Sequence, residues 1–131
     1  MPNAELAARI RTEITQRPEH HDQAHWFTGD VLRPDEDLDA PAHCGTTLCV
    51  AGYAAHFTGH ILLPSGIAVL PNTSKRRYIE RVAHALLGLT DSDADWLFHP
   101  LRAHDEVLAA LGQLADGAAA IDTDAIASHV N

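Results

Sequence analysis

Apolar residues recur every three or four positions in several stretches of this chain, which is the spacing of one buried face of an α-helix. In the first stretch the apolar positions are Leu6, Ile10 and Ile14, Asn3 can cap the start, and Pro18 ends the pattern. Similar stretches follow, with Ser, Thr or Asp before them and Gly after several of them. They predict helices over about 5–16, 46–58, 74–87, 90–98, 103–115 and 123–129.

The second predicted helix is unusual because most of its residues are small. Thr46 or Thr47 can cap its start, just as Ser74 can cap the third helix. The small residues are Ala51, Gly52, Ala54 and Ala55. A glycine inside a helix costs about 1 kcal/mol relative to alanine, so its presence indicates a close approach of neighbouring chain.

Two stretches lack a helical pattern. Residues 18–43 are polar and contain several prolines, with Trp26 and Phe27 as apolar anchors and an acidic second half that we expect to face solvent. Residues 61–73 are compatible with a short β-hairpin, but their mixed pattern favours irregular chain.

These elements predict a mostly α fold. We expect residues 1–131 to form a single domain, an irregular or orthogonal bundle of about five helices. A long polar loop, residues 18–43, follows the first helix, and residues 123–131 are expected to fray. A core rich in Ala and Leu and poor in aromatic residues, which are 5% of the chain, suits closely packed helices.

Charge narrows the range of partners. The formal net charge is −9, and such an acidic protein repels nucleic-acid phosphates and anionic lipid, so neither nucleic acid nor membrane is an expected partner. Lys75, Arg76 and Arg77 form a basic cluster that could make a local contact or simply face water in the first turn of a helix. We find no apolar run of transmembrane length and no secretion signal, which predicts a cytoplasmic protein with reduced thiols.

The two cysteines are the first candidates for chemistry. Cys44 falls near the predicted start of the second helix, where the helix dipole favours a thiolate, so Cys44 with His43 or His25 is a weak catalytic candidate. Cys49 lies within the small-residue helix, where a cysteine acts as a small apolar residue. A Cys44–Cys49 disulfide is conceivable in an oxidising environment, but it would close only a small loop.

Ten histidines in a chain of this length raise the question of a metal site. The weak candidate ligands are His20, His25, Cys44 and His60, and zinc is the cofactor that they would suit. The spacing of the cysteines and histidines matches no standard zinc motif, so the default expectation is that no cofactor is bound.

Three blocks of sequence carry a resemblance to known proteins. They are Pro18–Trp26, then Cys44-Gly45-Thr46-Thr47-Leu48-Cys49-Val50-Ala51-Gly52, and then Ala85–Leu89 with Leu97-Phe98. The chain resembles small uncharacterised proteins of actinobacteria and their phages that share a Cys-Gly-Thr-x-x-Cys-x-Ala-Gly core, although Tyr53 stands where those proteins usually have Trp. The resemblance implies a cytoplasmic accessory protein of actinobacterial or phage origin and carries no activity with it.

The leading functional hypothesis is therefore a non-enzymatic module that binds another protein. We expect an exposed apolar or aromatic surface around the Trp26 loop and the second helix. The predicted binding residues are Trp26, Cys44, Gly45, Thr46, Thr47, Cys49 and Tyr53. The alternatives are a thiol- or metal-dependent site centred on Cys44, and self-association through the Ala/Gly face of the second helix.

Overall fold

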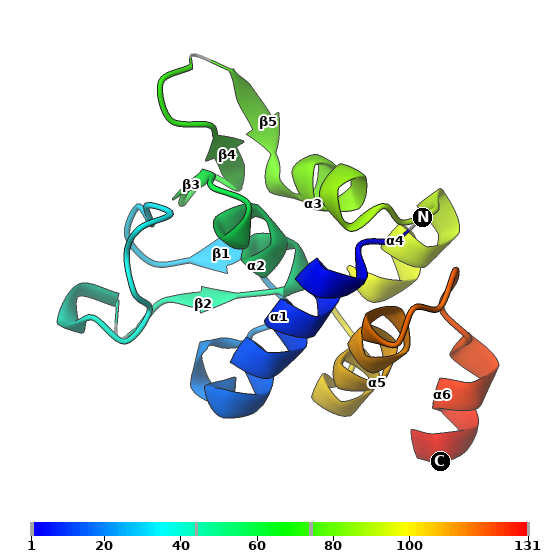
Figure 1. Cartoon of the computed structure of the whole chain (residues 1–131). Coiled ribbons are helices and arrows are strands. Elements are labelled where there is room, and N and C mark those ends of the chain that lie inside the picture. The colour runs from blue at the N-terminus through cyan, green and yellow to red at the C-terminus, as the bar shows by residue number, and fades with distance from the viewer. Residues whose placement is uncertain (1, 44, 74, 131) are drawn as a thin grey trace.

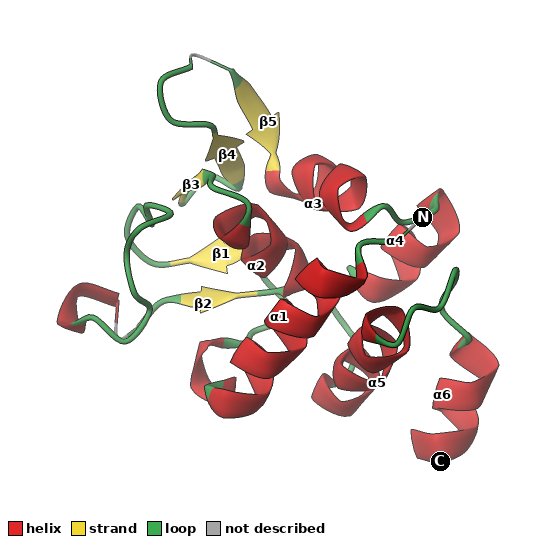
Figure 2. Ribbon diagram, viewed as in Figure 1, coloured by secondary structure: helices red, strands yellow, loops and turns green. Residues whose placement is uncertain are grey.

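The computed structural model describes residues 2–43, 45–73 and 75–130 of the chain (Figure 1). It is helix-rich, as the sequence predicts, with 48% of residues helical and 12% in strands. The strands form two small antiparallel sheets, so the expectation of a purely helical bundle is wrong in this respect (Figure 2).

Six α-helices are found among the described residues. They are α1 (Ala4–Gln16), α2 (Val50–Phe57), α3 (Ile79–Leu87), α4 (Asp91–Leu97), α5 (His104–Ala115) and α6 (Thr123–Val130). Local signals define several of their ends: Asn3 caps α1 by accepting from the Leu6 amide, Thr90 caps α4, and Gly88 ends α3 in the left-handed conformation. The sequence predicts the cap at Asn3 and the end of the third helix at Gly88, and it offers Thr90 or Asp91 as the start of the fourth helix. Every described helix is too short or too polar to cross a lipid bilayer.

Helix α2 lies at the centre of the molecule. It packs against α1, α3 and the first strand of the larger sheet, while α1 also packs along α5 (Figure 1). Ala51, Ala54 and Ala55 have no exposed surface, and the whole run from Val50 to His56 is buried. The small side chains of α2 are therefore used inside the molecule, where they let its neighbours approach closely.

The start of α2 differs from the prediction. Its N-cap is Cys49, and Thr47–Leu48 instead form strand β2, which pairs with β1 (Phe27–Thr28). The Cys49 amide donates to the carbonyl of Trp26 at 3.4 Å, so this non-local pairing continues up to the helix start. Pairing with a segment twenty residues earlier overrides the caps that Thr46 or Thr47 could have provided.

The larger sheet occupies the region that we expected to be irregular. Strands β3 (Ile61–Leu63), β4 (Ile67–Val69) and β5 (Arg76–Tyr78) pair in that order. Gly66 closes the first turn with a φ of 85°, which an L-residue rarely adopts. Helix α3 then begins at Ile79 rather than after Ser74, because residues 76–78 pair with β4.

The segment 18–43 is held to the rest of the protein at several points. It contains two 3₁₀ turns, η1 (Pro18–His20) and η2 (Pro41–His43), in addition to β1. Leu32 exchanges two backbone hydrogen bonds with Leu62, and the side chain of Leu38 is only 2% exposed. The acidic half of this segment is thus anchored by a buried leucine, although its carboxylates remain near the surface.

Candidate functional site

Three of the seven binding residues predicted from the sequence are buried inside the protein. Cys49 and Tyr53 have no exposed surface, and Thr46 is also buried. Trp26 is half-buried, with its ring edge-on to Phe98, while Thr47 is half-buried and Gly45 is exposed. Cys44 lies outside the described residues. Because α2 is enclosed, it offers no apolar surface of the kind that we expected there.

Cys49 is a structural thiol. Its Sγ atom lies 3.8 Å from the carbonyl oxygen of Trp26, to which the thiol donates. Burial raises the pKa of Cys49 to about 12, so the sulfur is protonated at neutral pH. It therefore cannot act as a nucleophile in the folded protein.

The histidines that were considered with the cysteines make separate contacts. His43 is buried, with Nε2 3.0 Å from Glu36 Oε2 and Nδ1 3.2 Å from Thr46 Oγ1. His25 is exposed and lies 3.1 Å from Asp22. His60 is buried beside the hydroxyl of Thr58, and burial lowers its pKa.

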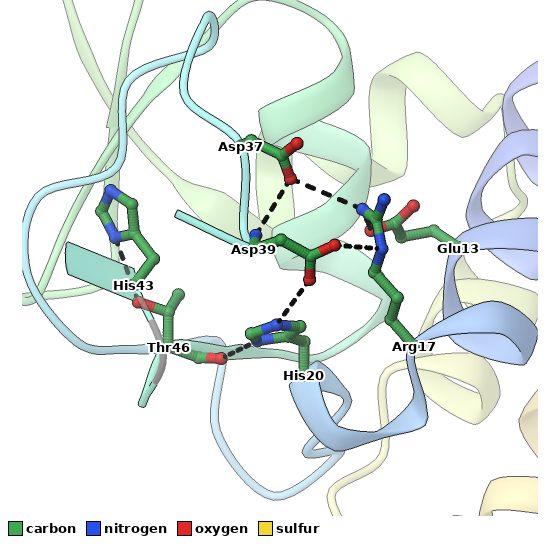
Figure 3. A network of polar contacts seen from close by, with 7 residues as sticks. All are labelled: Glu13, Arg17, His20, Asp37, Asp39, His43 and Thr46. Carbon is green, nitrogen blue, oxygen red and sulfur yellow. Dashed lines mark hydrogen bonds and ion pairs between the residues drawn. The ribbon is translucent and has the colours of Figure 1, made fainter. Parts of the chain in front are cut away.

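A polar network joins the end of α1 to the acidic part of the 18–43 segment (Figure 3). Arg17 is its centre: Nε lies 2.9 Å from Asp39 Oδ2, and NH1 lies 2.9 Å from Glu13 and 3.6 Å from Asp37. These carboxylates raise the pKa of Arg17, most strongly through Glu13. The guanidinium fixes the orientation of Asp39 and leaves its other oxygen, Oδ1, free to face His20.

His20 is the buried member of this network. Its Nδ1 atom lies 2.7 Å from the carbonyl oxygen of Thr46, and its Nε2 atom lies 3.7 Å from Asp39 Oδ1. Glu19 precedes it in η1, and one ligand atom from each of Glu19, His20 and Asp39 lies within 4.8 Å of the others. Within the described residues this is the only such cluster of three, and it includes His20 but neither His25 nor His60.

A second feature is a concentration of positive charge on β5 and α3. Lys75, Arg76, Arg77 and Arg81 are all exposed and make up four of the nine Lys and Arg residues of the chain. Tyr78, which follows Arg77 in β5, is 60% exposed. We call these five residues the basic edge, because β5 is the outer strand of the three-stranded sheet.

A hollow of about 460 Å³ runs beside the basic edge along α3. Its lining residues are Arg77, Arg81, His84, Ala85, Gly88 and Leu89. An adjoining hollow of about 350 Å³ shares Arg81 and His84 but includes Asp91 and Asp95, so its charge is mixed. The groove is therefore basic at the end next to β5 and turns acidic towards α4.

Comparison with protein-family models, with curated proteins and with solved structures gave no match to this chain. Its function must therefore be inferred from the geometry of its own residues.

Sequence reasoning found parts of both features. It singled out His20 and the cluster 75–77, but it did not connect Glu19 and Asp39 to His20 or Arg81 to the basic cluster. The i, i+4 spacing of Arg77 and Arg81 was a usable signal, because such residues share one face if the chain continues as a helix. The approach of Asp39 to His20 depends on the path of the 18–43 segment, for which the sequence carries no simple signal.

Proposed function

We propose that this protein is a non-enzymatic interaction module of the cytoplasm that binds an acidic, extended segment of a partner protein along the basic edge. The observation that carries the proposal is the placement of four exposed cations and an exposed tyrosine in and directly beside the outer strand β5, in a chain whose net charge is −9. Two of the four cations, Arg77 and Arg81, line the groove along α3.

The outer strand supplies the main-chain part of the interaction. An edge strand has a row of N–H and C=O groups that face outward, and an extended peptide can pair with them as an additional strand. Alternate residues of a strand point to opposite faces of the sheet. Arg77 accordingly lies on the face of the groove along α3 and lines it together with Arg81, while Arg76 and Tyr78 lie on the other face.

The charge of the edge selects the partner. Two copies of β5 paired side by side would bring Arg76 and Arg77 of each copy close together, and like charges opposite one another destabilise a strand pair. A nucleic acid would meet the repulsion of the rest of this acidic surface. A short peptide with a few carboxylates contacts only the basic end of the groove, because Asp91 and Asp95 repel it farther along.

The aromatic residue adds affinity to this arrangement. Tyr78 presents a large, rigid side chain with a polar end, and tyrosine and arginine are the residue types most enriched where binding energy concentrates. Self-association through the small residues of α2 would require that buried helix to leave the core, so the basic edge is the better interaction surface.

Titration of the isotope-labelled protein with a ten-residue peptide of alternating Glu and Val tests the proposal by NMR. Chemical-shift changes are expected in residues 75–81 and in the groove, and the affinity should fall when salt is raised from about 50 mM to about 500 mM. A peptide of alternating Lys and Val is the probe of opposite charge; acidic residues elsewhere on the protein can attract it, but it should not shift the signals of residues 75–81.

A matched pair of variants locates the surface. Arg77→Glu/Arg81→Glu should abolish binding of the acidic peptide, whereas Arg11→Glu/Arg33→Glu, which changes the net charge equally at exposed sites elsewhere, should retain most of it. Equal loss in both variants, or equal shifts of residues 75–81 by the two peptides, would show that the basic edge does not select the acidic peptide and would refute the proposal.

A further inference from the structure

We propose that Glu19, His20 and Asp39 form a binding site for one Zn²⁺ ion, which fastens the 18–43 segment to the end of α1. This site is independent of the basic edge. It combines one imidazole nitrogen with two carboxylate oxygens, a ligand set that zinc accepts with a fourth position left to solvent.

The spacing of the three residues fits a single ion. Bonds of about 2.0–2.2 Å to a tetrahedral zinc place two ligand atoms about 3.3–3.5 Å apart. His20 Nε2 and Asp39 Oδ1 are 3.7 Å apart, and one oxygen of Glu19 lies within 4.8 Å of a ligand atom of each of these residues. Small rotations of the two exposed carboxylate side chains close the remaining difference without moving the buried histidine.

The tautomer of His20 provides the second, independent observation. The carbonyl of Thr46 can only accept a hydrogen bond, so Nδ1 of His20 carries the proton and donates it at 2.7 Å. In a neutral imidazole the lone pair then resides on Nε2. A backbone carbonyl that holds the far nitrogen of a histidine is the usual support for a metal-ligating ring, because it fixes both the tautomer and the orientation.

Nε2 of His20 is left without a hydrogen bond among the described residues. The side chain is 5% exposed, and Nε2 faces an oxygen of Asp39 at 3.7 Å, beyond hydrogen-bond distance. A lone pair that faces a carboxylate oxygen is repelled by it unless a positive charge lies between them. A bound cation satisfies both groups at once.

The charge around the site also favours a cation. Three carboxylates, those of Glu13, Asp37 and Asp39, contact the guanidinium of Arg17, and a fourth, that of Glu19, lies beside His20 and Asp39. Arg17 binds Oδ2 of Asp39 and so directs Oδ1 towards His20. The excess of negative charge remains after this pairing, and a divalent ion reduces it.

The alternative to a metal ion is a proton, which would make an ion pair between the imidazolium of His20 and Asp39. The experiment has to distinguish bound Zn²⁺ from this ion pair. The full chain, freed of metal with EDTA and returned to neutral buffer, is titrated with Zn²⁺ in the presence of a chromophoric chelator. Co²⁺ then serves as a spectroscopic probe, because its visible absorption reports the number and type of ligands. We expect one equivalent of Zn²⁺ to bind, with a nitrogen- and oxygen-type Co²⁺ spectrum that lacks thiolate charge transfer.

Variants assign the ligands. Glu19→Gln and Asp39→Asn change exposed residues and should leave the fold intact by circular dichroism, yet each should weaken Zn²⁺ binding at least tenfold, and His20→Ala should abolish it. The control variants Cys44→Ser and His25→Ala remove the other two ligand types considered from the sequence, and both should bind Zn²⁺ as tightly as the parent protein. If no saturable binding is found at about 100 µM Zn²⁺, a proton rather than a metal ion joins His20 to Asp39. Binding that survives Asp39→Asn but disappears with Cys44→Ser would place the ion at another site. Either result overturns the proposal.

Discussion

The α-carbon of Gly52 faces the carbonyl oxygen of Trp26 so closely that a methyl group on it would overlap that oxygen. The same methyl group would lie 3.0 Å from Cβ of Leu48. Helix α2 therefore crosses the β1–β2 pair at backbone contact. This contact explains why a glycine occupies the middle of the central helix. It also gives a structural reason for the Ala51-Gly52 pair.

Substitution Gly52→Ala should destabilise the protein by about 2–3 kcal/mol, because the oxygen that it meets is the backbone carbonyl of Trp26, which directly precedes β1 and is held by the amide of Cys49. Gly112→Ala is the matched control. Gly112 also lies within a helix, but a Cβ there meets only the flexible side chain of Arg11 at 3.4 Å. The control should gain about 0.5–1 kcal/mol from helix propensity. Urea unfolding of the two variants measures both values, and a stable Gly52→Ala protein would contradict the close approach.

The parts of the fold that depend on residues close together in the sequence were predictable from the sequence. Asn3, Thr90 and Gly88 mark helix ends through contacts that lie within a few residues of each of them. The starts of α2 and α3 were misplaced because each is preceded by a strand whose partner is elsewhere in the chain. The pairing of Thr47–Leu48 with Phe27–Thr28 is stronger than a local cap, and no local pattern indicates it.

The candidate sites show the same difference between local features, which the sequence predicts, and contacts between distant residues, which it does not. His20 could be selected by residue type alone, but its carboxylate partner Asp39 is nineteen residues later. Their meeting depends on Leu38, whose burial brings the acidic part of the segment back to the end of α1. An acidic stretch is ordinarily expected to face solvent, so a single leucine within it was too weak a signal.

Leu38→Ala tests this anchoring. Leu38 is 2% exposed, and removal of its buried methyl groups should cost about 2–3 kcal/mol. Amide exchange of residues 35–40 should also accelerate, because the ion pairs of Asp37 and Asp39 with Arg17 are near the surface and contribute little by themselves. Val31→Ala removes a side chain that is 40% exposed and should change stability by less than about 0.5 kcal/mol. Equal effects of the two substitutions would show that Leu38 is not an anchor.

Cys49 should be inert towards alkylation while the protein is folded. At pH 8 a thiol with a pKa of about 12 is ionised about a thousandfold less than an ordinary cysteine, and its burial adds a steric barrier. The measurement uses a Cys44→Ser background, so that iodoacetamide reports on Cys49 alone, followed by mass spectrometry with and without urea. Labelling should require urea. Rapid labelling of the folded protein would mean that the thiol is accessible and could take part in chemistry.

His56 should make the stability of the protein depend on pH. Burial, reinforced by the positive charge of Arg9, lowers the pKa of His56 from 6.5 to about 4, and its Nδ1 atom has no hydrogen-bond partner among the described residues. Between pH 6.5 and 4 the unfolded chain takes up a proton at this position that the folded protein does not. The free energy of unfolding should therefore be greatest above pH 6.5 and fall as the pH is lowered, with a loss of roughly 3 kcal/mol once the folded state is protonated too.

The variant His56→Leu separates this contribution from the others in the same pH range. Leucine fills a similar volume and does not titrate, so the fall in stability between pH 6.5 and 4.5 should become shallower. It should not vanish, because burial also lowers the pKa of His21 and His60. The carboxylates of Asp22 and Glu36, whose pKa values are lowered by hydrogen bonds, lose their contribution only at still lower pH. If urea unfolding at pH 7 and pH 5 gives the same difference for His56→Leu as for the parent chain, then His56 is not held neutral by the fold.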